Sequence, residues 1–197
     1  MPKRHSKKLN PRKIPLAKRE INETEIIEEA TKDDLYHGWL LVLTALAEQV
    51  PLEEIPEIVE GVNQFIAKPA VSRKWKAEDE QRAGKMMGLK PPYEHLRLNE
   101  VKSAVELEHF KKKLSRFAIF NAFCIICLGI DSLTKLSPEK IRQIFFSADL
   151  TLAEIESGYT SYEDLEERLD HTGISIHRIT DDMHHVVILN QTTYSPT

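Results

Sequence analysis

The chain has 197 residues, of which 41% are hydrophobic and 29% are charged, and its formal net charge at pH 7 is −4. This apolar fraction is sufficient for a buried core. Seven glycines and two cysteines argue against folds that depend on glycine-rich phosphate loops or on a disulfide framework. No apolar run reaches the ~18 residues of a membrane span, and no apolar signal core follows the basic start. We therefore expect a cytoplasmic protein with no membrane partner.

The first 19 residues predict a basic arm. They contain eight Lys/Arg and no acid, which leaves 19 basic and 31 acidic side chains for the rest of the chain, a net charge of −12. Pro2, Pro11 and Pro15 disfavour a helix there. Lysine and arginine bind phosphates by releasing counterions, so the arm predicts contact with DNA or RNA. A solubilising leader, or an arm that docks on the chain's own acidic face, is the alternative. The arm residues predicted to bind nucleic acid are Lys3, Arg4, Lys7, Lys8, Arg12 and Lys13.

Two predicted helices follow the arm. The first runs from Asn22 or Thr24 to about Gln49, and its residues 39–47 are apolar nearly all round, which is typical of a central core helix. Residues 52–67 place apolar side chains at spacings of three and four, which predicts an amphipathic second helix.

A second basic region covers residues 68–90, which hold seven basic and three acidic side chains around Trp75. Basic residues interleaved with an aromatic ring favour nucleic-acid contact. The alternative is an exposed helix, capped by Ser72 and ended at Gly88, that Trp75 anchors to the core. The residues predicted to contact nucleic acid here are Arg73, Lys74 and Lys76.

A long helix is predicted from Asn99 to about Leu128, with Gly129 as its end. Its amphipathic first half carries three further predicted nucleic-acid contacts, Lys111, Lys112 and Lys113. Its second half, residues 118–130, is too short to span a bilayer and is interpreted as a buried core helix.

Cys124 and Cys127 form a CxxC pair inside this apolar stretch. Zinc would require two more ligands, and a redox pair normally opens a helix, where the dipole lowers the thiol pKa. The pair is therefore interpreted as two small core residues.

Three shorter helices are predicted after this, with N-terminal signals at Ser137, Thr151 and Ser161. The last two, separated by Gly158, have the spacing of a helix-turn-helix. The second of them carries a net charge of −4 over residues 161–170, which would repel a phosphate-lined groove. This acidic helix is instead predicted to bind protein through Glu163, Asp164, Glu166 and Glu167.

The C-terminus changes from helical to alternating periodicity. Residues 174–179 and 184–189 predict a small β-hairpin with Asp181 and Asp182 in the turn. In that register His177 and His184 would lie close together, so a metal-dependent hydrolase is a further hypothesis. The default interpretation is surface histidines with no metal and no cofactor.

These patterns predict a mainly α fold: a helical bundle with an extended basic N-terminal arm and a small C-terminal β-hairpin. We expect an arm over residues 1–19, a helical core over 20–130, and short helices plus the hairpin over 131–197, packed with the core. No serine elbow, Walker A loop, dinucleotide fingerprint or HExxH motif occurs, so no enzyme is predicted.

Two short stretches, residues 10–15 (NPRKIP) and 155–165 (IESGYTSYEDL), resemble small uncharacterised helical proteins encoded by phages and prophages of Firmicutes. The resemblance leaves residues 68–130 unmatched. It implies a phage or mobile-element context and carries over no functional residue.

The function expected from the sequence is that of a non-enzymatic binding protein. The basic arm would contact nucleic acid or a nucleoprotein, and the acidic C-terminal third would bind a protein partner. One alternative is an inhibitor of a host defence nuclease complex, similar to anti-CRISPR proteins and acting by protein–protein binding. Another is a structural or oligomeric scaffold. The sequence does not fix the oligomeric state.

Overall fold

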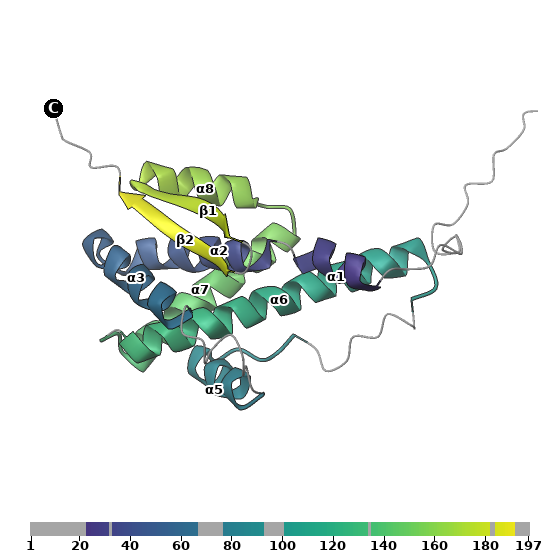
Figure 1. Ribbon diagram of the computed structural model, residues 1–197, viewed down its shortest axis with the longest axis horizontal. Coiled ribbons are helices and arrows are strands. Elements are labelled where there is room, and N and C mark those ends of the chain that lie inside the picture. Colours follow the sequence, from purple (N-terminus) through teal and green to yellow (C-terminus); the bar gives the residue numbers. More distant parts are fainter. Residues whose placement is uncertain are drawn as a thin grey trace, which may run out of the picture. The chain divides into compact units, whose positions relative to one another are not determined.

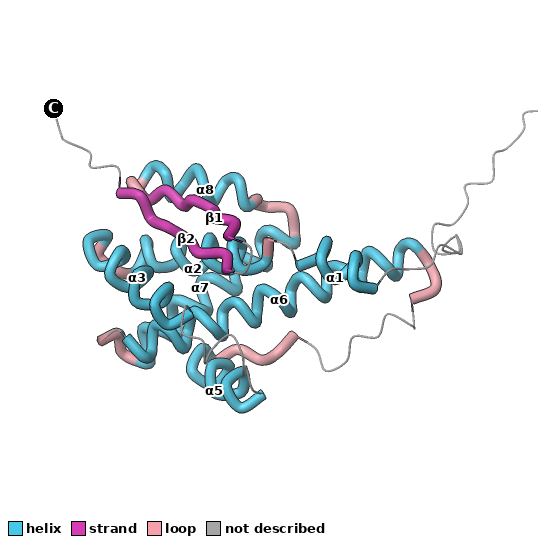
Figure 2. Tube along the Cα trace, in the orientation of Figure 1, coloured by secondary structure: helices cyan, strands magenta, loops and turns pink. Residues whose placement is uncertain are grey.

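The structure is a computed structural model that describes residues 23–31, 33–66, 77–92, 101–133, 135–181 and 184–191. Over these residues the fold is mainly α, as predicted: seven α-helices, one 3₁₀ turn and one hairpin (Figures 1 and 2). By its contacts the chain forms two compact units. Unit 1 comprises residues 1–32 and 92–118, and unit 2 comprises residues 33–91 and 119–197. The predicted arm lies outside the described residues.

The helix predicted from Asn22 or Thr24 to Gln49 is two helices. α1 covers Glu23–Thr31 and belongs to unit 1, whereas α2 covers Asp34–Gln49 and belongs to unit 2. Asp33 is the N-cap residue of α2, and aspartates at this end of a helix are stabilised by the helix dipole. Asp33 makes no side-chain capping hydrogen bond to α2. The prediction of one helix was wrong, because α1 ends at Thr31 and α2 begins at Asp34.

The centre of unit 2 is α2, as its apolar sequence predicted. The run from Trp39 to Leu46 is at most 5% exposed at every position. Gly38 lies against α6, since a Cβ at Gly38 would stand 2.7 Å from the Cβ of Ala122. A glycine is thus required for the close approach of these two helices.

The long helix α6 covers Ala104–Leu133 and differs from its prediction at both ends. At the start, Ser103 Oγ accepts a hydrogen bond from the backbone N–H of Glu106 at 3.2 Å, while the predicted cap Asn99 lies outside the described residues. At the end, the helix continues past Gly129. A Cβ there would come within 3.0 Å of Val62, so Gly129 allows close packing rather than ending the helix.

Among the described helices, α6 alone is long and apolar enough to cross a bilayer, and 56% of its most apolar stretch is buried within the structure. The second half packs into unit 2. Phe123 and Phe145 meet edge to face there with ring centroids 5.7 Å apart, and Ile126 and Ile130 are fully buried. The prediction that this half is buried in the core is confirmed.

Unit 2 also contains two shorter helices, α3 and α5. A 3₁₀ turn, η2 (Leu52–Glu54), leads into α3 (Ile55–Ile66), and α5 covers Ala77–Met87. Gly88 ends α5 with φ 73°, and the N–H of Leu89 donates to the carbonyl of Gly84 at 3.0 Å. The predicted glycine cap of this helix is confirmed, because only glycine adopts such a φ without strain.

Helix α7 covers Pro138–Glu156 and joins two segments that were predicted as separate helices. Its start is as predicted, with Ser137 Oγ accepting from the N–H of Lys140 at 3.2 Å. Thr151 is not a cap: its hydroxyl donates to the carbonyl of Ser147 at 3.1 Å, inside the helix. No glycine or proline interrupts this segment, so the helix runs through it.

The chain ends in α8 (Tyr162–His171) and the antiparallel hairpin of β1 (Ile174–Asp181) and β2 (His184–Gln191). The predicted capping box is present, since Ser161 Oγ accepts from the N–H of Asp164 and Asp164 accepts from the N–H of Ser161. Strand β1 lies beside α8, and β2 lies beside α2 and α3 (Figure 1). The hairpin, which would be marginal alone, is thus supported by helices.

Candidate nucleic-acid and protein interfaces

Most of the predicted nucleic-acid contacts lie outside the described residues. These are the arm residues and the second group, namely Lys3, Arg4, Lys7, Lys8, Arg12, Lys13, Arg73, Lys74 and Lys76. The predicted contacts that the structure places are Lys111, Lys112 and Lys113, on the part of α6 that belongs to unit 1.

Helix geometry divides this lysine triplet. Lys112 and Lys113 are exposed, whereas Lys111 is half-buried and lies about 160° around the helix from Lys113. Exposed His109 and half-buried Arg116 lie on the side of Lys112 and Lys113 at spacings of three and four residues. We call His109, Lys112, Lys113 and Arg116 the α6 basic stripe. Its helical spacing was visible in the sequence, although His109 and Arg116 were not predicted as contacts.

The two compact units carry net charges of opposite sign. Unit 1 carries 15 Lys/Arg against 9 Asp/Glu, a net charge of +6, and unit 2 carries 12 against 22, a net charge of −10. A difference of this size gives the two units opposite preferences for charged partners. Both the arm and the α6 basic stripe belong to unit 1.

The four predicted protein-binding acids of α8 divide into two pairs. Asp164 is occupied in the capping box, and Glu166 accepts a hydrogen bond from the Tyr36 hydroxyl at 2.5 Å. Glu163 and Glu167 are exposed, one helical turn apart. The structure therefore leaves Glu163 and Glu167 as the acids of this set best placed to meet a partner.

Polar and aromatic contacts hold α8 against α2. The rings of His37 and Tyr162 stack with centroids 3.7 Å apart and planes 6° from parallel, and Arg168 forms an ion pair with Glu48 at 2.8 Å. Burial raises the pKa of Tyr162 well above its usual value, and the carboxylates of Asp34 and Glu156 raise it further. Tyr162 therefore stays a neutral phenol at physiological pH.

Cys124 and Cys127 are fully buried in the core of unit 2, as the interpretation of two core residues predicted. Burial raises the pKa of Cys127 to about 12, with Asp131 contributing in the same direction, and burial raises the pKa of Cys124 further still. Because the thiolate is the nucleophile and the metal ligand, these protonated thiols are poorly suited to either role.

The hairpin register separates His177 from His184. Asp181 pairs with His184, and His177 pairs with Ile188, whereas the predicted register would pair His177 with Val186. His177 and Asp181 are four residues apart, or about 13 Å at the usual rise of a strand. The predicted proximity of the two histidines was wrong. Over the described residues, no group of three or more His, Cys, Asp or Glu side chains is placed to hold a metal ion.

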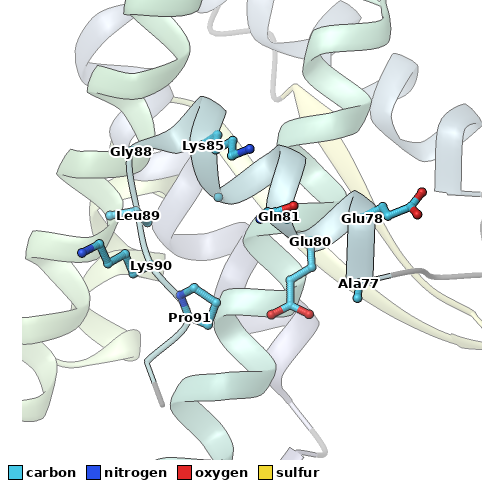
Figure 3. Close-up of a pocket in the computed structure, with 10 residues that line it drawn as sticks. Ala77, Glu78, Glu80, Gln81, Lys85, Gly88, Leu89, Lys90 and Pro91 are labelled. Atoms are coloured by element: carbon cyan, nitrogen blue, oxygen red, sulfur yellow. The ribbon is translucent and has the colours of Figure 1, made fainter. Parts of the chain in front are cut away.

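A cavity of about 790 Å³ lies along α5 and the segment that follows it (Figure 3). Figure 3 shows the amino groups of Lys85 and Lys90 pointing in different directions, with the Glu80 carboxylate to the right of Pro91 in this view. The described residues that line the cavity are Ala77, Glu78, Glu80, Gln81, Gly84, Lys85, Gly88, Leu89, Lys90 and Pro91. None of these lining residues is a serine, a cysteine or a histidine. This lining offers scattered charges and no nucleophile paired with a base.

The sequence matches no protein family, and neither the curated proteins nor the solved structures include one detectably similar to it.

Proposed function

We propose that this chain is a non-enzymatic binding protein that contacts nucleic acid, alone or in a nucleoprotein, through the basic surface of unit 1. The observation that carries the proposal is the separation of charge between the units, +6 in unit 1 and −10 in unit 2. The phosphate backbone attracts a basic surface whatever the base sequence. An acidic unit on the same chain disfavours binding through any other face.

Two elements of unit 1 supply the contacts. The arm provides eight basic side chains without an acid, and the α6 basic stripe provides exposed Lys112 and Lys113 one helical turn from His109 and Arg116. Lysines on a helix surface position a protein on phosphates without reading bases. The expected binding is therefore salt-dependent and tolerant of sequence. The group of Arg73, Lys74 and Lys76 belongs to unit 2 and remains a further predicted contact outside the basic surface of unit 1.

The test measures binding of the full chain to single- and double-stranded DNA and RNA across a salt series. The variant Lys112→Glu/Lys113→Glu should weaken binding, and for duplex DNA each lost phosphate contact should reduce the steepness of log K against log salt by about 0.9. Deletion of residues 1–19 should reduce this salt dependence more, since the arm holds eight basic side chains.

The matched control is Lys85→Glu/Lys135→Glu, which makes the same change of net charge on exposed lysines of unit 2. Binding that is equally reduced by the control would show a non-specific effect of net charge. Binding that survives both the arm deletion and Lys112→Glu/Lys113→Glu unchanged would contradict the proposal.

A second candidate function is protein binding through α8, as in an inhibitor of a host defence nuclease complex. The exposure of Glu163 and Glu167, while neighbouring acids are occupied within the fold, favours this candidate. Glu163→Lys/Glu167→Lys should abolish inhibition of a nuclease complex without loss of helix content. Inhibition that this variant leaves intact would remove α8 from the interface.

A further inference from the structure

Helix α7 presents large apolar side chains to solvent on the face opposite its core contacts. Phe146 is 57% exposed and Leu150 is 51% exposed, and they are one turn apart on the same side of the helix. The opposite side buries Ile144, Phe145 and Leu152, where α7 packs on α2. The helix is thus apolar on two faces, and one of them has no partner within the described residues.

Phe146 and Leu150 are two of the five large hydrophobic side chains that are exposed in the described part of the chain. They adjoin on one side of a helix, and adjoining exposed apolar side chains are typical of an interaction surface. A third exposed side chain, Tyr159, follows three residues after α7 and is 88% exposed. We call Phe146 and Leu150 the α7 face.

Charged residues flank the α7 face in a pattern that is complementary to itself. Half-buried Lys140 and exposed Arg142 flank its N-terminal half, and exposed Glu154 and Glu156 flank its C-terminal half. Exposed Glu139 lies in line with the face at the start of the helix. By helical periodicity, Lys140 and Glu154 lie about 40° apart around the axis, and so do Arg142 and Glu156. Each flank therefore has a base near one end of the helix and an acid near the other.

We propose that the α7 face binds the same face of a second copy of this chain, with the two α7 helices antiparallel about a two-fold axis that passes between Phe146 and Leu150, level with Ala148 along the helix. Residues equally far before and after Ala148 then lie opposite each other, so Phe146 meets Leu150 of the second copy. On each flank the basic end of one helix meets the acidic end of the other. A parallel arrangement would instead place like charges together, which is unfavourable.

The size of the face sets the expected strength of the dimer. Two helices that meet along one face bury less than the roughly 800 Å² per partner of a standard interface. We therefore expect a dimer that dissociates at concentrations on the order of micromolar. Such a dimer brings two copies of unit 1 together, which would raise the avidity for a long polyanion.

The test is sedimentation velocity of the full chain over a concentration series without nucleic acid, so that its outcome is independent of the proposed function. We expect a monomer–dimer equilibrium that Phe146→Gln/Leu150→Gln shifts to monomer at all concentrations. Both side chains are exposed in the monomer, so circular dichroism and melting of the dilute variant should match the parent chain.

A charge swap tests the antiparallel geometry. Lys140→Glu should raise the dimer dissociation constant by roughly tenfold, because the symmetry places two altered pairs in each dimer, and Lys140→Glu/Glu154→Lys should restore it. A chain that stays monomeric at the highest concentration would overturn the proposal. A dimer that Phe146→Gln/Leu150→Gln leaves intact would also overturn it. If Lys140→Glu/Glu154→Lys dimerises more weakly than Lys140→Glu, the antiparallel pairing is wrong.

Discussion

Unit 1 and unit 2 differ in net charge, and their described parts differ in how many apolar side chains they bury. Unit 2 contains the hydrophobic core, from Trp39 of α2 to Ile174 of β1, and carries a net charge of −10. In the described part of unit 1, Ile26 is the buried hydrophobic side chain, and the net charge is +6. The positive charge of unit 1 comes from residues 1–19, which hold eight Lys/Arg and no acid, because the rest of unit 1 holds seven Lys/Arg against nine Asp/Glu. Unit 2 is therefore both the acidic unit and the unit in which the described core lies.

The largest expected effect tests which unit holds the stability of the chain. Phe123→Ala should lower the free energy of unfolding by about 3–5 kcal/mol, because it removes a fully buried ring from the core of unit 2. Ile26→Ala in unit 1 should cost less, because it removes a smaller side chain that is 8% exposed, whereas Phe123 is 1% exposed. Urea unfolding followed by circular dichroism measures both. Equal losses would contradict the contrast in burial between the units.

A smaller effect concerns the buried thiols of unit 2. The pKa of Cys127 is raised to about 12 from 9.0, so between these values the unfolded chain releases a proton that the folded chain retains. Stability should therefore fall as pH rises above 9, by about 1.4 kcal/mol per pH unit for each such thiol. Unfolding midpoints at pH 8 and pH 10 measure the loss.

The matched control for the thiols is Cys127→Ala, which should remove part of this pH dependence. At pH 8 a thiol reagent should label the parent chain only after denaturant is added, because both cysteines are fully buried. Rapid labelling of the native chain would place Cys124 or Cys127 outside the core.

The smallest expected effect separates stability from binding. Ser161→Ala removes the acceptor of the Asp164 N–H at the start of α8 and should cost about 1 kcal/mol. Affinity for nucleic acid should not change, because α8 belongs to the acidic unit. Thermal melting and a binding titration on the same sample test both statements. A large change in affinity would place α8 at the nucleic-acid interface.

Local signals in the sequence predicted the elements whose structure depends on local chemistry. The capping box at Ser161, the glycine cap at Gly88 and the all-round apolar run of α2 are present as predicted. Errors arose where packing overrides a local signal. Gly129 is required by the proximity of Val62, and Thr151 donates to a carbonyl within a continuous helix.

The candidate surfaces were predicted less completely than the fold. Charge counts found the acidic helix and the lysines of α6, but which side chains share a face depends on helix geometry and on contacts with other elements. The occupation of Glu166 by Tyr36, 130 residues away along the chain, has no sequence signal. The exposure of Phe146 and Leu150 likewise follows from which face of α7 packs on α2.

Lysine footprinting with and without a saturating oligonucleotide, read by mass spectrometry, would show directly which unit binds nucleic acid, because a single sample reports on both units. We expect Lys112, Lys113 and the arm lysines to lose reactivity toward an acetylating reagent when nucleic acid is bound. Lys85 and Lys135 of unit 2 should react unchanged. Protection of Lys85 and Lys135 with Lys112 and Lys113 still reactive, or no protection at any lysine, would contradict this expectation.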